Sequence, residues 1–323
     1  DAVRWAAPEI VPRILQLADG QGYAREDDWL SGVTTVAPKK LMQRIHNPGE
    51  NVRRVSTVGT ILQRCQTAGA DSLCNAEIAR LFTARGDDFS AVCHAADRLR
   101  SEVIGSGVSF VSNRNINYTN ICYFKCKFCA FSKGKVAQDL RDKPYNLGLE
   151  EIQRRTIEAR EMGATEVCLQ GGIHPEYTGQ HYIDVCHAIK DVLPDMHIHA
   201  FSPLEVWQGA ETLEISLSEF IDRLMAAGLG SMPGTAAEIL DDKVRQRLCA
   251  DKVNTAQWLE VMETAHRAGL STTATIMFGH IDQYEDWATH LITIRDLQAR
   301  TSGFTEFVPL SFVAHMAPMY RRG

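Results

Sequence analysis

Apolar residues keep helical spacing in one stretch of the chain and then fall into short and long segments that alternate. From Ser56 to Ile104 they recur every three or four residues, which predicts helices, the last stopped by Gly105. We then expect strands at residues 107–113, 165–170, 196–201, 229–232, 271–278 and 303–310. We expect helices near residues 149–162, 181–192, 217–227, 236–248, 255–268 and 284–299. Alternating strands and helices are typical of an α/β fold with a parallel sheet, because parallel strands need crossover connections.

Three regions follow from this arrangement. Residues 1–55 are punctuated by proline and glycine and are interpreted as a linker or N-terminal arm. Residues 56–105 form a helical cap, and residues 106–323 form the strand and helix region. Capping boxes beginning at Ser216, Thr235 and Asn254 mark expected helix starts.

Composition excludes several classes of protein. Hydrophobic residues make up 45% and charged residues 23% of the 323 residues, as in globular proteins, and the net charge of −6 argues against a nucleic-acid partner. No apolar run reaches the ~20 residues of a membrane span, and no signal peptide is visible. The first residue is Asp1 rather than methionine, so we expect a chain that was processed or cut from a longer one. Nine cysteines, an odd number, argue against a disulfide framework and favour a reducing interior, the cytoplasm or an organelle.

Three cysteines, Cys122, Cys126 and Cys129, follow one another with the spacing C-x3-C-x2-C, and Phe128 precedes the last. Thiolates are soft ligands that suit iron–sulfur clusters, zinc or copper(I). A structural zinc site needs four protein ligands, and no fourth cysteine or histidine lies nearby in the sequence. Three thiolates can hold three irons of a four-iron cubane and leave one iron open for a substrate. A zinc knuckle, or three unrelated buried cysteines, remains the alternative.

This cysteine motif resembles the cluster motif of radical S-adenosyl-L-methionine (SAM) enzymes. The longer string NRNINYTNICYFKCKFCAFSKG is similar to the tyrosine-using half of FO synthase, the family that makes the deazaflavin core of coenzyme F-420. The resemblance covers about residues 56–323 and implies a 4Fe-4S cluster whose open iron binds SAM. It also implies that the reduced cluster cleaves SAM to methionine and a 5'-deoxyadenosyl radical.

The implied reaction joins tyrosine to 5-amino-6-(D-ribitylamino)uracil. The radical takes a hydrogen from tyrosine, the side chain leaves as a 4-hydroxybenzyl radical, and this radical adds to the uracil. The implied fold is a (β/α) barrel of the radical SAM type, with the chemistry at the carboxyl ends of its strands. Six strands are expected in this chain. The family carries two more, so we expect a C-terminally incomplete sequence.

Two glycines, Gly171 and Gly172, follow the second expected strand and let a ligand approach the backbone. The resemblance implies that they bind the amino group of SAM. Ile173 stands where the superfamily usually has an acidic residue, so that side-chain contact is missing. Without the resemblance, the pair reads as an ordinary turn.

Candidate substrate-binding residues lie on strands one and three. The string His-x-His-x-x-Ser-Pro-x-Glu, shared with the family, places His199, Ser202 and Glu205 near the end of strand three, with His197 on the same strand face. Asn113, Asn115 and Asn117 share one face of strand one, where buried amides would need a polar partner such as the substrate. Histidines satisfied within the core, and local Asx-turns, are the alternatives.

Two later residues complete the candidates. Glu306 lies among Phe304, Phe307 and Val308, so we expect a buried carboxylate that holds the substrate's amine, and His280 follows strand five. Glu306 and His199 are the candidates for a catalytic role. Cys168 lies inside strand two and is excluded as a fourth cluster ligand.

A basic segment follows the cysteines, with six basic and two acidic residues between residues 125 and 143. We expect it to steer an acidic flavodoxin or ferredoxin that donates the electron. A second partner implied by the resemblance is the ring-closing radical SAM half, fused or separate. Two other functions stay open: a radical SAM enzyme of the futalosine route to menaquinone, or a non-catalytic metal-binding domain.

Overall fold

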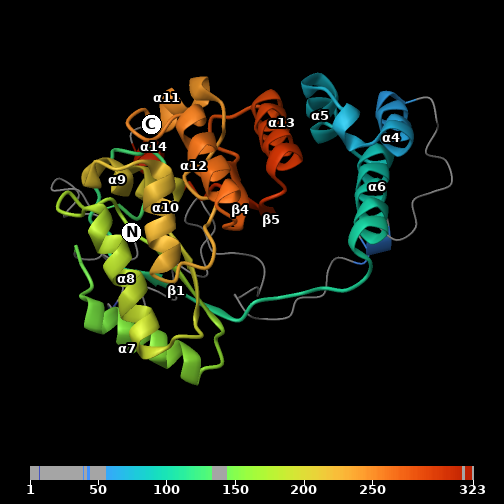
Figure 1. Cartoon of the computed structure of the whole chain (residues 1–323). Coiled ribbons are helices and arrows are strands. Elements are labelled where there is room, and N and C mark those ends of the chain that lie inside the picture. Colours follow the sequence, from blue (N-terminus) through green and yellow to red (C-terminus); the bar gives the residue numbers. More distant parts are fainter. Residues whose placement is uncertain are drawn as a thin grey trace. The chain divides into compact units, whose positions relative to one another are not determined.

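The computed structural model describes residues 56–132, 144–314 and 317–321, together with residues 7, 39, 42 and 43 (Figure 1). The chain divides into two compact units. The first contains Asp1–Leu73, Arg80–Ser106 and Val313–Gly323, and the second contains Cys74–Ala79 and Gly107–Phe312. Most of the expected N-terminal arm lies outside the described residues. Among the described residues, no helix has both the length and the apolar character that crossing a membrane requires.

The first unit is helical. Its helices are α4 (Thr57–Ala68), η1 (Ala70–Ser72), α6 (Asp87–Ile104) and α14 (Pro318–Arg321), and α5 (Asn75–Phe82) divides between the units. The Ser56 hydroxyl caps α4 by accepting from the Gly59 N–H at 2.9 Å, and it donates to Asp88 Oδ1 in the first turn of α6 at 2.9 Å. Gly105, with φ of 75°, ends α6 as expected.

Parallel strands form the centre of the second unit. They are β1 (Asn113–Asn117), β2 (Glu166–Gln170), β3 (His197–Ala200), β4 (Thr272–Phe278) and β5 (Phe304–Ser311). The first three pair in the order β1-β2-β3, and β4 pairs with β5. Single parallel bridges from His199 to Ser231 and from Met232 to Thr272 join the two sheets.

Helices connect these strands (Figure 1). They are α7 (Leu149–Glu161), α8 (Gly179–Val192), α9 (Pro203–Leu213), α10 (Leu217–Ala226), α11 (Asp242–Cys249), α12 (Thr255–Arg267) and α13 (Tyr284–Thr301). The face of β1–β3 that carries Ile116, Leu169 and Ile198 is buried in one hydrophobic cluster with Val185 and Ile189 of α8. Because side chains alternate along a strand, the opposite face carries the three asparagines of β1 together with Glu166, Gln170, His197 and His199.

Two strand expectations were wrong. The first strand begins at Asn113 rather than Gly107, because pairing with β2 starts there; Val108 and Phe110 alternate like strand residues but are 88% and 89% exposed. The fourth expected strand, residues 229–232, is reduced to the bridges at Ser231 and Met232. Pro233 follows at once, and proline cannot donate a ladder hydrogen bond.

Two helix starts also differed from expectation. Thr235 and Glu238 do not form a capping box: Glu238 has φ of 47°, and α11 begins only after Asp241, whose carboxylate accepts from Lys243 N–H at 2.8 Å. Helix α9 was not expected. It begins after Ser202, which forms a capping box with Glu205, and Pro203 occupies its first turn. The capping box at Asn254 is present as expected.

Candidate active site

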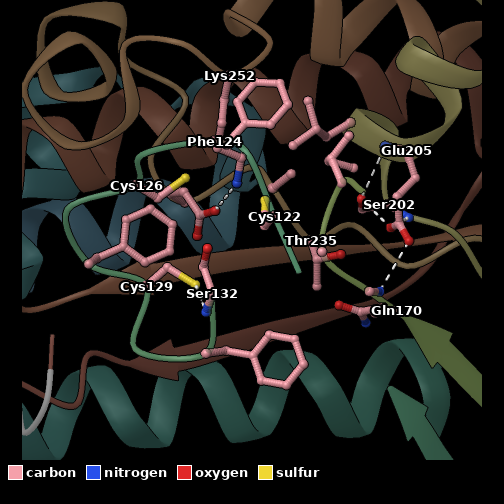
Figure 2. Close-up of a pocket in the computed structure, with 18 of the residues that line it drawn as sticks. Cys122, Phe124, Cys126, Cys129, Ser132, Gln170, Ser202, Glu205, Thr235 and Lys252 are labelled. Carbon is pink, nitrogen blue, oxygen red and sulfur yellow. Dashed lines mark hydrogen bonds and ion pairs between the residues drawn. The ribbon is translucent and has the colours of Figure 1, made fainter. Parts of the chain in front are cut away.

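A pocket of about 210 Å³ lies at the carboxyl ends of β2 and β3 and gathers segments distant in sequence (Figure 2). Its lining residues are Cys122, Phe124, Cys126, Phe128, Cys129, Phe131, Ser132, Gln170, Gly171, Gly172, Ile173, Ser202, Leu204, Glu205, Thr235, Ala236, Glu238, Lys252, Thr275 and Leu310. Figure 2 shows the three cysteines around one end of the pocket and Ser202, Glu205 and Gln170 toward the other. The expected cysteines, Phe128, both glycines, Ser202 and Glu205 therefore share one cavity.

Backbone hydrogen bonds attach the cysteine loop to the surrounding unit. Tyr123 N–H donates to the carbonyl of Ile173 at 3.2 Å, and Lys127 N–H donates to the carbonyl of Leu248 at 2.8 Å. Lys125 N–H donates to the Asp251 carboxylate at 2.8 Å. The loop has no helix or strand of its own, so these distant partners position its thiols.

Three thiols line the pocket, those of Cys122, Cys126 and Cys129. Burial raises the pKa of Cys122 and of Cys126, which disfavours their thiolate forms unless positive charge lies nearby.

Both glycines make room for neighbouring residues. A Cβ on Gly172 would overlap the carbonyl of Ile121 and approach Cys122 Cβ to 2.9 Å, and a Cβ on Gly171 would overlap the Tyr118 ring. The Gly172 N–H donates to the carbonyl of Thr119 at 2.9 Å. The glycine pair therefore lets the end of β2 approach the segment that leads into the cysteines.

Glu205 is a carboxylate at 1% exposure with four donors. Its Oε1 accepts from the Tyr118 hydroxyl and from Gly171 N–H at 3.2 Å, and its Oε2 accepts from the Ser202 hydroxyl and from Ser202 N–H at 2.6 Å. Burial raises the pKa of Glu205, and these hydrogen bonds oppose the rise. Ser202 and Glu205, expected as barrel-interior groups, thus line the pocket and also cap α9.

The polar face of β1–β3 carries the expected asparagines in rows with residues of β2 and β3. Asn113 is level with Glu166 and His197, and Asn115 is level with Cys168 and His199. A third row joins Asn117 to Gln170, which lines the pocket. The asparagines themselves lie outside the pocket lining. Asn113 Nδ2 donates to Glu166 Oε1 at 3.3 Å, and Asn115 Nδ2 donates to Asn117 Oδ1 at 3.3 Å.

His197 and His199 converge on one hydroxyl. His197 Nε2 lies 2.8 Å and His199 Nδ1 lies 2.7 Å from Ser231 Oγ. Burial lowers the pKa of His199 to about 4, and His197 adds to the effect, so the His199 ring is neutral near pH 7. His199 does not line the pocket, but the row it shares with Asn115 and Cys168 lies on the same strand face as Gln170.

The two late candidates do not reach the pocket. Glu306 is exposed, which contradicts the expected buried carboxylate, because β5 turns most of its residues to solvent. His280 is held within its own loop: its Nε2 donates to the carbonyl of Met277 at 3.0 Å, and its Nδ1 lies 2.9 Å from Asp282 Oδ1. These two contacts hold the His280 ring within its own loop, and His280 does not line the pocket.

Thr235, Glu238 and Lys252 are among the pocket residues that had not been expected. Thr235 Oγ1 is buried and has no hydrogen-bond partner among the described residues. Lys252 and Glu238 form an ion pair of 2.7 Å. Thr235 and Glu238 had been interpreted as a capping box, and Lys252 follows no recognisable motif, so only the fold reveals them.

Comparisons with known proteins identify the family of the chain. Residues 116–293, more than half of the chain, match the Radical SAM superfamily. The chain belongs to the radical SAM superfamily. Membership implies a 4Fe-4S cluster and SAM, and it confirms the expected class of fold.

The chain is also similar to proteins with named activities. The chain is 49% identical over 247 residues to FO synthase of Mycobacterium leprae, covering 76% of this chain and 28% of that protein. It is 47% identical over 231 residues to 5-amino-6-(D-ribitylamino)uracil--L-tyrosine 4-hydroxyphenyl transferase of Methanocaldococcus jannaschii, covering 71% of this chain and 63% of that protein. The chain thus spans less than two thirds of the length of these relatives.

Solved structures support the radical SAM fold. The FeFe-hydrogenase maturase HydG from Carboxydothermus hydrogenoformans matches with a TM-score of 0.61 at 19% identity, covering 84% of this chain and 61% of that one. Methylornithine synthase (PylB) matches with a TM-score of 0.60 at 15% identity, covering 80% and 70%. At these identities the likeness concerns the fold alone.

The pocket fits the two groups that radical SAM membership implies. Three sulfur donors suit iron, and Thr235 Oγ1 offers a buried hydroxyl with no partner among the described residues. The glycine pair also lines the pocket, and the carbonyl of Ile121 and Cys122 Cβ lie close to Gly172. The sulfur donors at one end of the pocket suit an iron–sulfur cluster. The polar groups at the other end suit SAM, which joins an amino acid to a nucleoside.

Proposed function

We propose that this chain joins the 4-hydroxybenzyl group of tyrosine to 5-amino-6-(D-ribitylamino)uracil in deazaflavin synthesis. The observation that carries the proposal is its 47% identity to the transferase of that name from Methanocaldococcus jannaschii. The C-x3-C-x2-C cysteines that line the pocket support it. Methionine, 5'-deoxyadenosine and an imino-acetate fragment are the accompanying products.

In this proposal Cys122, Cys126 and Cys129 hold three irons of the cluster. When bound and reduced, the cluster supplies the electron that cleaves SAM and starts the radical reaction. The surrounding aromatic residues, including Phe128, exclude water from the thiols. The protein contributes binding, orientation and exclusion of water, and the cofactors contribute the radical chemistry.

SAM binds beside the cysteines through the end of β2 and the loop after Met232. Gly171 and Gly172 line the pocket there, and the Thr235 hydroxyl has no hydrogen-bond partner in the part of the chain that the structure describes. Glu205 is already saturated by four donors, so it orients the loop after β2 and does not contact SAM directly.

The substrates occupy the polar strand face next to the pocket. Asn113, Asn115, Asn117 and His199 provide amide and imidazole groups for a uracil ring and ribityl hydroxyls, and Ser202 borders the SAM end. Neutral His199 is the candidate for proton transfer, because its pKa is lowered to about 4 by burial. Glu306 and His280 are not retained, since neither lines the pocket.

Two protein partners complete the proposal. An acidic flavodoxin or ferredoxin would dock on the basic segment; Lys133, Lys135, Arg141 and Lys143 of that segment lie outside the described residues. The ring-closing half would be fused or separate. Free thiols and an oxygen-sensitive cluster suit the cytoplasm or a reducing organelle.

The decisive test is an anaerobic incubation of the iron- and sulfide-loaded protein with SAM, tyrosine, the diaminouracil and dithionite. We expect the coupled product together with 5'-deoxyadenosine, and neither from the Cys126→Ala variant. Cleavage of SAM without coupling, but with turnover of a futalosine-route substrate, would favour the sister enzyme of menaquinone synthesis. Zinc without labile sulfide would indicate a non-catalytic metal-binding domain.

A further inference from the structure

Lys252 and Glu238 form a buried ion pair in the wall of the pocket. Their side chains are 8% and 11% exposed, and Lys252 Nζ lies 2.7 Å from Glu238 Oε1. Lys252 Nζ also lies 5.4 Å from the centre of the Phe128 ring. Phe128 lies between Cys126 and Cys129 in the sequence. Burying two charges is costly and seldom adds stability, so the position of the pair suggests a functional reason.

The backbone that carries this pair is held in place. Ala236 and Glu238 have φ of 64° and 47°, a region that residues with a side chain rarely adopt. The buried Arg245 guanidinium donates to three carbonyls of this loop and to the carbonyl of Val253. The Arg245 side chain therefore joins the Glu238 loop to Val253, the residue that follows Lys252. These hydrogen bonds fix the Lys252 ammonium group relative to the pocket.

We propose that Lys252 is a fixed cation that raises the reduction potential of the cluster held by Cys122, Cys126 and Cys129. Reduction adds one negative charge, and a nearby positive charge in a poorly solvated site stabilises the reduced state. Glu238 holds the ammonium in position and partly offsets its charge. The inference rests on the cluster site given under the proposed function.

The cation and the cysteines share one cavity. Lys252 lines the same pocket as Cys122, Cys126 and Cys129, and Figure 2 shows it at the end of the pocket that carries Cys126. The thiolates of a bound cluster would therefore lie in the field of the Lys252 ammonium group.

The test is an EPR-monitored redox titration of the loaded protein without SAM, after iron and sulfide have been counted. We compare Lys252→Met, which keeps the length of the side chain, with Glu238→Gln and with Lys252→Arg. Lys243→Met is the matched control, because it removes an exposed cation from the neighbouring helix α11. None of these measurements depends on turnover.

At the midpoint potential of the wild type, we expect the ratio of reduced to oxidised cluster to fall about tenfold in Lys252→Met. For a one-electron couple this corresponds to about 59 mV toward more negative potential. Glu238→Gln should shift the potential in the opposite direction, and Lys252→Arg and Lys243→Met should match the wild type. Opposite shifts from the two members of one pair would not arise from a merely structural role.

A fully loaded Lys252→Met protein with the wild-type potential would overturn the proposal, even if its affinity for SAM falls, since Lys252 would then serve SAM. If Lys252→Met fails to load, Glu238→Gln decides: an unchanged or lowered potential overturns the proposal. Absence of labile sulfide in the wild type would overturn the cluster site itself, which separates the failure of the proposed function from the failure of this inference.

Discussion

The Tyr118 hydroxyl donates a hydrogen bond to the Glu205 carboxylate and links the end of β1 to the first turn of α9. Both side chains are buried, and burial raises the pKa of each. The same carboxylate accepts from Gly171 N–H, so three segments that border the pocket meet at Glu205. This contact connects the stability of the fold with the geometry of the site.

Replacing Tyr118 by Phe should lower the free energy of unfolding by about 1–3 kcal/mol, because a buried carboxylate loses one of its donors. Denaturant unfolding measures the change. Tyr123→Phe is the control: its hydroxyl donates to Gln208 Oε1 at 2.6 Å on the surface, so we expect a change within about 0.5 kcal/mol. Equal losses in both variants would contradict a special role for the Glu205 contact.

Replacing Cys126 by Ala should lower iron and labile sulfide and abolish SAM cleavage, because a cubane with two protein thiolates is poorly held. Cys168→Ala, in the middle of β2, should retain the full content of both. Chemical analysis after anaerobic loading gives the answer. Wild-type iron and SAM cleavage in Cys126→Ala would refute the assigned ligands.

Thr235→Val should weaken SAM binding about two- to tenfold, the equivalent of one hydrogen bond of about 0.5–1.5 kcal/mol. Its stability should not fall, because Thr235 Oγ1 has no partner among the described residues. Thr275→Val offers the contrast, since the Thr275 hydroxyl donates to the carbonyl of Gly234 at 2.7 Å and its loss should destabilise the protein. Anaerobic equilibrium dialysis measures affinity. A stability loss in Thr235→Val without weaker binding would exclude the SAM contact.

Asn115→Leu and His199→Phe should reduce the coupled product more than they reduce SAM cleavage, because both residues lie on the strand face and not in the pocket lining. The measurement is the ratio of coupled product to 5'-deoxyadenosine in one reaction. A proportional fall in both products would indicate that these residues support the SAM site or the fold.

Acidification should destabilise the protein through His290. Burial lowers its pKa to about 3, whereas an unfolded histidine titrates near about 6.5. Between these values the unfolded chain binds the extra proton, so stability falls as the pH drops below about 6.5. In His290→Asn, whose side-chain oxygen can still accept from Leu240 N–H, the loss between pH 7 and pH 5 should be smaller. A wild-type loss of stability between pH 7 and pH 5 in His290→Asn would contradict this assignment.

Local chemistry accounts for what could be predicted from the sequence. The cysteine spacing and the string around it indicated the superfamily before any fold was known. Segment periodicity located most helices, and the capping residues Ser216 and Asn254 marked two helix starts, because these signals depend on neighbours a few residues away. The one-face arrangement of Asn113, Asn115 and Asn117 followed from the alternation of strand side chains.

Only the tertiary structure decided the features that depend on distant partners. Pairing with β2 set where β1 begins, and the turn after Met232 replaced an expected strand by bridges. The Ser-Pro-x-Glu string starts a helix as well as lining the pocket. The pocket brings together Thr235, Glu238 and Lys252. Their loops are closed by contacts between residues that lie 8 and 14 positions apart in the sequence: Arg245 donates to the carbonyl of Val253, and Lys252 pairs with Glu238. A sequence pattern records local spacing, whereas burial and pairing depend on which distant segment arrives opposite each side chain.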